Sequence, residues 1–184
     1  MTLRVEDSSN RGNSQPNSEE SAARGAAAQD CPLIIGFGNI LLQDDGAGVQ
    51  LLRRLRLESA LSHCAFVDGG AIGLSLLPYV EAAESMLVLD AADLASPPGT
   101  VALFEGPAMD SFLKSARRRT RHEVGLIDLL DMARIENSLP QRRALLCIQP
   151  GQIYWGDTLS PAVAEGLTQA TELASDLLNR WNTA

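Results

Sequence analysis

Short, continuous apolar runs alternate with longer stretches in which apolar and polar positions are mixed. The run from Pro32 to Phe37 is typical, because an unbroken apolar segment of this length favours a strand buried on both faces. In chain order, the pattern predicts strands at 32–37, 64–67, 86–89, 100–104 and 144–148, and helices at 46–61, 74–84, 123–134 and from 161 onward. This alternation predicts a three-layer α/β/α fold around a mostly parallel, twisted sheet of roughly five strands.

The last predicted helix has the most regular pattern. Ser160 precedes Pro161, so a residue type that caps helices is followed by proline at the first helical position. The apolar positions after it recur in steps of four and three, which predicts one buried face. They are Val163, Leu167, Ala170, Ala174, Leu177 and Trp181.

Residues 1–30 differ from the remainder of the chain. They are rich in Ser, Asn, Glu and Ala, contain no aromatic residue, and have Leu3 and Val5 as their only large aliphatic residues. Such a segment buries too little surface to offset the entropy of ordering, so we expect a disordered N-terminal tail at 1–30 and a single α/β domain at 31–184. A mitochondrial presequence is the alternative, but presequences are poor in acidic residues and this segment has several.

Composition narrows the functional classes. The chain has 184 residues, 45% of them apolar, and a net charge of −8, which argues against nucleic acid or an anionic membrane as a partner. Its three cysteines form no CxxC pair, and no apolar run is long enough to span a bilayer. We therefore expect a cytoplasmic protein, and nothing in the sequence requires more than a monomer.

Acidic residues follow the first three predicted strands. Asp44 and Asp45 come shortly after the first strand, Asp68 follows the second and Asp90 the third, while His122 directly precedes the helix at 123–134. In a parallel sheet these positions meet at the edge where ligands bind. Two carboxylates and an imidazole could hold nickel, zinc or iron, and a set of three ligands leaves a coordination position open.

Structural interpretations compete with the functional one, and they weigh differently for each of these residues. Asp44 could cap the following helix, and Asp68 before two glycines could form a turn. Asp90 directly follows a buried strand, where an unpaired charge is costly, so a functional role is favoured. His122 lies at a helix start, which disfavours the protonated imidazole and favours a neutral one that can bind metal.

Three other features leave alternatives open. Gly36 and Gly38 partly match a nucleotide-binding loop, but position 41 is leucine where the third glycine would be. The basic run at 117–121 is a solvated loop or a basic rim for a peptide carboxylate. Tyr154 and Trp155, after the fifth strand, either contact a partner or pack against the domain.

Five segments together resemble the [NiFe]-hydrogenase maturation endopeptidases. The resemblance runs from about residue 33 to 181, with the opening block the most specific. The blocks are Gly36–Val49 (GFGNILLQDDGAGV), Asp68–Gly73 (DGGAIG), Leu87–Ala91 (LVLDA), His122–Leu126 (HEVGL), and Ile148–Pro150 with Leu159–Pro161 (IQP, LSP).

The resemblance implies an endopeptidase that removes a C-terminal extension from the hydrogenase large-subunit precursor after nickel has been inserted. The family positions associated with nickel recognition fall on Asp45, Asp90 and His122, and another acidic position of the family falls on Asp68. These four residues are the catalytic candidates, and the first three are the metal-ligand candidates. The resemblance also implies that the nickel belongs to the substrate. Ala71 stands where the family commonly has Thr or Ser, so a hydroxyl is absent there.

Three other functions remain as alternatives to a substrate-specific endopeptidase. A metallohydrolase would carry its own tightly bound ion. A nucleotide-binding regulatory module would use Gly36 and Gly38. A non-catalytic chaperone would bind the immature large subunit without cutting it.

Overall fold

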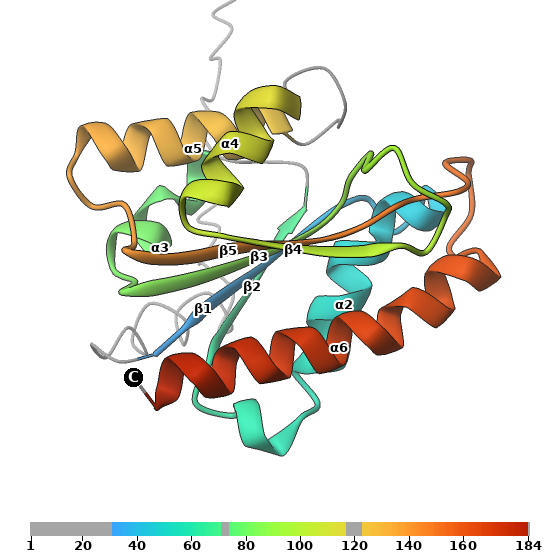
Figure 1. Ribbon diagram of the computed structural model, residues 1–184, viewed down its shortest axis with the longest axis horizontal. Helices are drawn as coiled ribbons and strands as arrows, with labels where there is room; N and C mark the ends of the chain where they lie inside the picture. The colour runs from blue at the N-terminus through green and yellow to red at the C-terminus, as the bar shows by residue number, and fades with distance from the viewer. Residues whose placement is uncertain (1–30, 71–73, 117–122, 184) are drawn as a thin grey trace, which may run out of the picture.

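The computed structural model describes residues 31–70, 74–116 and 123–183, and within them the strands form one sheet. The strand order is β2-β1-β3-β5-β4 (Figure 1). Parallel pairing joins β1 (Leu33–Phe37) to β2 (Ala65–Gly70) and to β3 (Ser85–Ala91), and joins β3 to β5 (Arg142–Ile148). The edge strand β4 (Val101–Glu105) pairs antiparallel with β5. The expected α/β fold with a mostly parallel sheet is confirmed.

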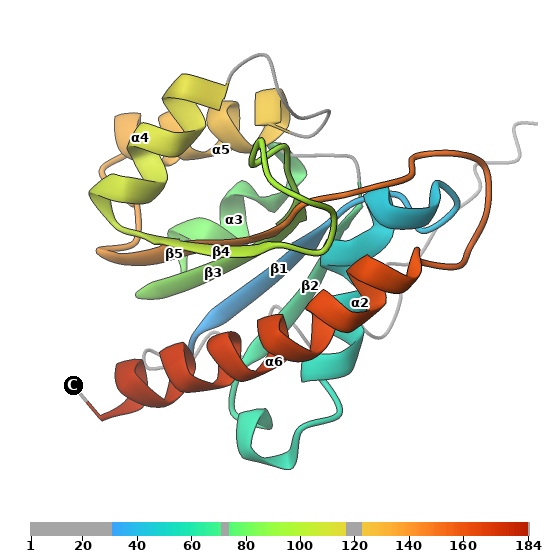
Figure 2. The ribbon, with the colours of Figure 1, turned by 45° about the vertical axis from the view of Figure 1, so that its right-hand side comes forward.

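Helices cover both faces of the sheet (Figure 2). On one face lie α2 (Ala47–Leu55) and α6 (Pro161–Asn182), and on the other lie α3 (Leu77–Glu81), α4 (Pro107–Ala116) and α5 (Glu123–Ile135). Three short 3-10 turns complete the described elements: η1 (Gln43–Gly46), η2 (Ser59–Leu61) and η3 (Leu74–Leu76).

Each central strand contributes alternate side chains to two apolar cores. In β3, Leu87 and Leu89 pack on the α2 and α6 side, whereas Met86 and Val88 pack on the α4 and α5 side. Every residue of β3 is buried, which explains why its sequence is an apolar run without the alternation of a half-exposed strand. The predicted stripe of the last helix is confirmed, since its residues from Val163 to Leu177 lie in the core and Trp181 packs at its margin.

The predicted helix at 46–61 is too long. The structure has η1, then α2 ending at Leu55, and a separate turn η2. Nine residues of helix rise about 14 Å, which nearly matches the length of about 17 Å of the five-residue strand β1, so α2 recrosses most of the sheet layer. The chain must then turn back toward β2, and Leu57 in that turn is 86% exposed.

Other boundaries also differ from the prediction. β2 continues through Gly70, because Asp68 and Gly70 still pair with β1, and β3 includes Asp90. The predicted helix at 74–84 is a 3-10 turn followed by the five-residue α3. Helix α4 was not predicted, although Pro107 begins it and its buried Met109 and Leu113 have helical spacing.

Candidate active site

The site lies where the strand order changes direction. From β1 the chain crosses over through α2 to β2 on one side, and later through α3 to β3 on the other side of β1. The carboxyl ends of β1 and β3 therefore flank a topological switch point, the position at which open α/β sheets bind ligands.

Two glycines let the chain after β1 lie directly over this switch point. A Cβ atom on Gly48 would lie 2.4 Å from the carbonyl oxygens of both Phe37 and Leu89. Gly38 has a φ of +134°, and a Cβ there would lie 2.1 Å from the carbonyl oxygen of Asp45. Only glycine permits approaches this close. As a result, the first turn of α2 rests on the ends of β1 and β3, and η1 is held beside β3.

The same packing argues against the nucleotide-binding interpretation of Gly36 and Gly38. A Cβ on Gly36 would lie 2.8 Å from the carbonyl oxygen of Gly48 and 2.8 Å from Cβ of Leu52. The space above both glycines is thus filled by the protein's own backbone, and the glycines serve helix–strand packing.

Asp45 and Asp90 are both buried at the switch point. Asp45 lies in η1, is 4% exposed, and accepts a hydrogen bond from the Asn39 amide at 3.1 Å. Asp90 lies near the end of β3, is 3% exposed, and accepts a hydrogen bond from the Ala91 amide at 2.8 Å. Both carboxylates make further interactions. The sequence-based placement of these two residues at one sheet edge is confirmed.

The Asp90 side chain faces the layer that contains α5. Asp90 lies two residues after Val88 and four after Met86, so it shares their face of β3, and both of those residues pack against that layer. Helix α5 runs from the carboxyl edge of the sheet, beginning at Glu123, back toward the start of β5. His122 precedes Glu123 in the sequence and lies outside the described residues, as do Ala71 and the basic run at 117–121.

Asp44 holds the loop that follows β5. Its fully buried carboxylate accepts four hydrogen bonds: from the amides of Gly151 (2.9 Å), Gln152 (2.8 Å) and Ser160 (2.6 Å), and from the Ser160 hydroxyl (2.8 Å). Burial alone would raise the pKa of this carboxyl, but the hydrogen bonds from Ser160, Gln152 and Gly151 outweigh it and lower the pKa below its ordinary value.

The capping roles expected for Asp44 and Ser160 therefore need correction. Neither η1 nor α2 receives a side-chain capping bond, so Asp44 does not cap the helix that follows it. Ser160 occupies the N-cap position of α6, but its hydroxyl donates to Asp44 and makes no cap bond to its own helix. Both side chains instead join two loops at the carboxyl edge.

Asp68 is exposed at the end of β2. Its Oδ1 accepts a hydrogen bond from the Gly70 amide at 3.0 Å, a contact typical of an aspartate that shapes a turn. The structural interpretation of this residue is thus observed, and Asp68 is exposed whereas Asp45 and Asp90 are buried. Across the described ranges, no three His, Cys, Asp or Glu side chains meet as a metal-binding group.

Tyr154 and Trp155 do not pack against the domain. They are 72% and 79% exposed, so the packing interpretation is wrong for both. Their loop is nevertheless fixed next to the site, because Gly156 accepts a hydrogen bond from the Gln43 amide at 2.8 Å and donates one to the Leu41 carbonyl at 2.9 Å. This arrangement has no local sequence signal beyond the two aromatic residues.

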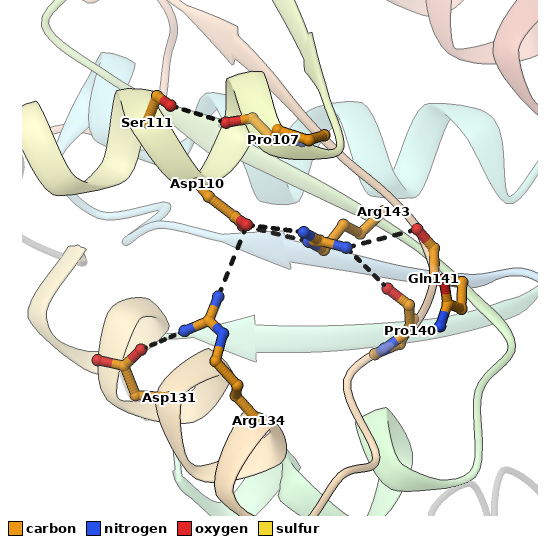
Figure 3. A network of polar contacts seen from close by, with 8 residues as sticks. All are labelled: Pro107, Asp110, Ser111, Asp131, Arg134, Pro140, Gln141 and Arg143. Carbon is orange, nitrogen blue, oxygen red and sulfur yellow. Dashed lines mark hydrogen bonds and ion pairs between the residues drawn. The ribbon is translucent and has the colours of Figure 1, made fainter.

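A second polar cluster lies away from the switch point and joins α4, α5 and β5 (Figure 3). Arg143 donates two hydrogen bonds to Asp110, at 3.1 and 2.6 Å, and Arg134 lies 3.6 Å from the same carboxylate. The bonds from Arg143 lower the pKa of Asp110 despite its partial burial. Because Arg143 is at the beginning of β5, this cluster stabilises the amino edge of the sheet.

Fold and site together define an α/β protein with two buried carboxylates at a sheet switch point. Residues 49–177 match the family model described as hydrogenase maturation protease. The chain therefore belongs to the hydrogenase maturation protease family, and the expected peptidase class is confirmed. These comparisons favour neither a chaperone nor a nucleotide-binding module.

Two curated relatives have similar lengths of matching sequence. The hydrogenase expression/formation protein HoxM of Cupriavidus necator is 35% identical over 150 residues, covering 80% of this chain and 73% of the relative. The hydrogenase expression/formation protein HupD of Rhodobacter capsulatus is 34% identical over 151 residues, covering 81% and 71%.

Solved structures confirm the fold. The hydrogenase maturating endopeptidase HybD from Escherichia coli superposes with a TM-score of 0.71 at 25% identity, covering 82% of this chain and 93% of that one. The [NiFe] hydrogenase maturation protease HybD from Thermococcus kodakarensis gives a TM-score of 0.68 at 28% identity, covering 80% and 98%. No helix in the described part of this chain combines the length and apolar character that crossing a membrane requires.

Proposed function

We propose that this protease removes the C-terminal extension of a nickel-loaded [NiFe]-hydrogenase large-subunit precursor. Its family membership and the resemblance of its five sequence blocks support this substrate. The observation that carries the proposal is the pair of buried carboxylates at one edge of the sheet, Asp45 in η1 and Asp90 near the end of β3. Buried acidic side chains are costly, and their position at a ligand-binding edge favours a functional reason for them.

In this proposal, the nickel ion is part of the substrate. Asp45, Asp90 and His122 complete its coordination when the precursor binds, so that binding itself tests whether nickel is present. Two carboxylate oxygens and one imidazole nitrogen are donors suited to a divalent ion of this type. His122 comes from the chain directly before α5, whose first turn lies at the same sheet edge as both aspartates.

Cleavage requires a water molecule to attack the scissile carbonyl. A carboxylate in a buried position can accept a proton from that water, provided that it lies within hydrogen-bond distance. Asp45 and Asp90 are the candidates for this role, and nickel next to the scissile amide would polarise its carbonyl. Asp68, which is more exposed at the end of β2, is a fourth candidate at the rim of the site.

We further propose that the protein acts in the cytoplasm as a monomer. Cys31 and Cys64 are free thiols in the structure, as expected for a protein in a reducing compartment. Analytical ultracentrifugation of the purified protein checks the monomer directly, and cell fractionation checks the compartment.

The test uses the purified protein and the large-subunit precursor from the same organism, with and without nickel. Intact mass is measured before and after incubation. We expect loss of a C-terminal peptide from the nickel-loaded precursor alone. Equal cleavage of the nickel-free precursor would overturn the nickel test, and an unchanged mass of a loaded, maturation-competent precursor would overturn the proposed activity. Metal analysis of the protease separates this proposal from a metallohydrolase that carries its own ion.

Variants then assign the residues. Asp45→Asn, Asp90→Asn and His122→Ala are each expected to lower kcat/KM by at least about a hundredfold, the scale typical of lost acid–base or electrostatic groups. Asp68→Asn is measured in parallel as the rim candidate. Asp176→Asn is the matched control, because Asp176 is an exposed carboxylate on α6. Full activity in an Asp90→Asn variant would remove Asp90 from the mechanism.

A further inference from the structure

Three consecutive apolar side chains project into solvent next to the site. Ile153, Tyr154 and Trp155 are 36%, 72% and 79% exposed, and Leu41, on the loop after β1, is 48% exposed. We call these four residues the aromatic rim. Large exposed apolar groups gathered at one place on a protein surface mark contact sites for partners.

The aromatic rim is held rigidly, although its loop contains neither helix nor strand. On one side of residues 153–155, the amides of Gly151 and Gln152 donate to Asp44, and the Asp44 amide donates to the Gln152 carbonyl at 3.1 Å. On the other side, Gly156 forms a parallel bridge with the chain at Leu42. The three exposed residues are therefore fixed at both ends.

Such an arrangement is unusual for a loop whose only role is to connect β5 to α6. A buried carboxylate and a backbone bridge hold it in place, yet its large side chains add little to the core. Polar residues at 153–155 would connect the same elements and would be better solvated. A backbone that is held in place before binding loses little entropy on contact, and aromatic residues supply much contact area, so the loop is suited to recognition.

The rim is also continuous with the proposed active site. Asp44, which fixes the loop, is adjacent in sequence to Asp45, and Leu41 belongs to the segment between β1 and η1. A polypeptide whose scissile bond lies at Asp45 and Asp90 extends about 3.3–3.6 Å per residue, so a few residues flanking that bond reach the rim. A peptide chain is thus the ligand that can occupy both places at once.

We propose that the aromatic rim binds the hydrogenase large-subunit precursor beside its cleavage site and determines which precursor is accepted. Tyr154 and Trp155 are its main contacts, with Leu41 and Ile153 at its margin. This inference rests on the proposed function for the identity of the partner. It assigns specificity to residues outside the group that handles nickel and water.

The test separates binding from cleavage. Tyr154→Ala/Trp155→Ala is compared with the wild type for cleavage of the nickel-loaded precursor and for binding to that precursor by biolayer interferometry. We expect KM and Kd to rise about tenfold or more, because buried aromatic residues dominate interface energetics, while kcat changes less than threefold. Hydrogen–deuterium exchange should show protection at 151–158 in the complex of the wild-type protein.

Leu57→Ala is the matched control. Leu57 is 86% exposed but lies in the turn after α2, at the opposite edge of the sheet. We expect wild-type KM and Kd for this variant. Circular dichroism and thermal unfolding of both variants confirm that they are folded, and Tyr154→Phe/Trp155→Phe should restore most of the affinity if aromatic contact is what matters.

Each alternative result has a distinct meaning. If the wild type cleaves the precursor and the double-alanine variant has unchanged KM and Kd, the aromatic rim is not the precursor contact. If the wild type binds without cleaving, the proposed function fails, whereas loss of binding in the variant still supports the rim. If the wild type neither binds nor cleaves, both fail. A concentration-dependent dimer that the double substitution dissociates, with KM unchanged, would assign the rim to self-association and overturn the proposal.

Discussion

The carboxylate of Asp44 accepts hydrogen bonds from both the amide and the hydroxyl of Ser160, which follows it by 116 residues. The distances are 2.6 and 2.8 Å. Through this pair, the segment after β1 fixes the start of α6, and the loop between β5 and α6 lies against the carboxyl edge of the sheet. The neighbouring Asp45 lies in the same 3-10 turn, so one structural and one candidate catalytic carboxylate are adjacent in sequence.

Ser160→Ala removes the hydroxyl but leaves the amide. We expect the free energy of unfolding to fall by about 1–2 kcal/mol, the usual value for a hydrogen bond to a charged group. Asp44→Ala removes all four acceptor contacts and should cost about 3 kcal/mol or more. Urea unfolding of the single and double variants in a double-mutant cycle measures the coupling. If the losses of free energy of unfolding in the two single variants add up to the loss in the double variant, the hydroxyl contact contributes nothing in solution.

Asp44 also makes stability depend on pH. Its pKa is lower in the folded protein than the ordinary value of about 3.9, so its carboxylate stabilises the fold fully above that value and progressively less as pH falls through the lowered pKa. The difference in free energy of unfolding between wild type and Asp44→Asn should therefore be largest near neutral pH and shrink below about pH 4. Urea unfolding at pH 7, 5, 4 and 3 measures it, with Asp157→Asn as an exposed control. A difference independent of pH would contradict the lowered pKa.

Gly48 tests whether the site depends on the close contact between α2 and the strand ends. Gly48→Ala would place Cβ 2.4 Å from the carbonyl oxygens of Phe37 and Leu89, and we expect a loss of about 2–3 kcal/mol together with reduced activity. Gly106→Ala is the control, because Gly106 has a φ of +51° but nothing within 4 Å of its Cβ position. That variant should lose about 1 kcal/mol through backbone strain and keep its activity. Thermal unfolding and precursor cleavage are measured for both.

The cluster in Figure 3 predicts unequal contributions from two arginines. Arg143 is 14% exposed and pairs with Asp110 through two bonds, so Arg143→Met leaves a partly buried carboxylate without its main partner and should cost about 3 kcal/mol. Arg134 is 43% exposed, and Arg134→Met should cost less than about 0.5 kcal/mol. Denaturant unfolding measures both. Because the cluster lies at the amino edge, kcat/KM should stay within twofold of wild type in each folded variant.

The thiol of Cys64 should be nearly unreactive. Burial, together with the nearby Cys31, raises the pKa of Cys64 to about 12. At pH 8 its thiolate population, and hence its rate with a disulfide reagent such as Ellman's, should be about a thousandfold below that of an unperturbed cysteine. The rate in the native protein is compared with that in guanidinium chloride, where reaction should be rapid. Rapid native labelling that mass spectrometry assigns to Cys64 would contradict the raised pKa.

The parts of the fold that sequence predicted best are those with a local physical cause. β1, β3 and β5 are buried on both faces, so their apolar runs indicated them directly. Asp45 and Asp90 were placed at one edge because the carboxyl ends of parallel strands meet there. His122 as the third member of that site stays a prediction.

Other features depend on distant parts of the chain and were not predictable in this way. Asp44 and Ser160 each have a common local role as helix caps, and only the folded structure shows that they bond to each other. The end of α2 is set by the length of the strands that it recrosses, which its own amphipathic pattern does not contain. The missed α4 is different, since Pro107 and the spacing of Met109 and Leu113 gave a usable signal.

The reversed direction of β4 has a consequence for how the rim of the site can vary. In a sheet of parallel strands alone, each crossover helix starts at the carboxyl edge, and only strand-to-helix connections lie there. Because β4 runs the other way, α4 ends at that edge and α5 begins there (Figure 1). Two helix ends, Ala116 of α4 and Glu123 of α5, thus border the edge that holds Asp45 and Asp90. The chain at those two ends can change in length and charge without shifting the register of any described strand.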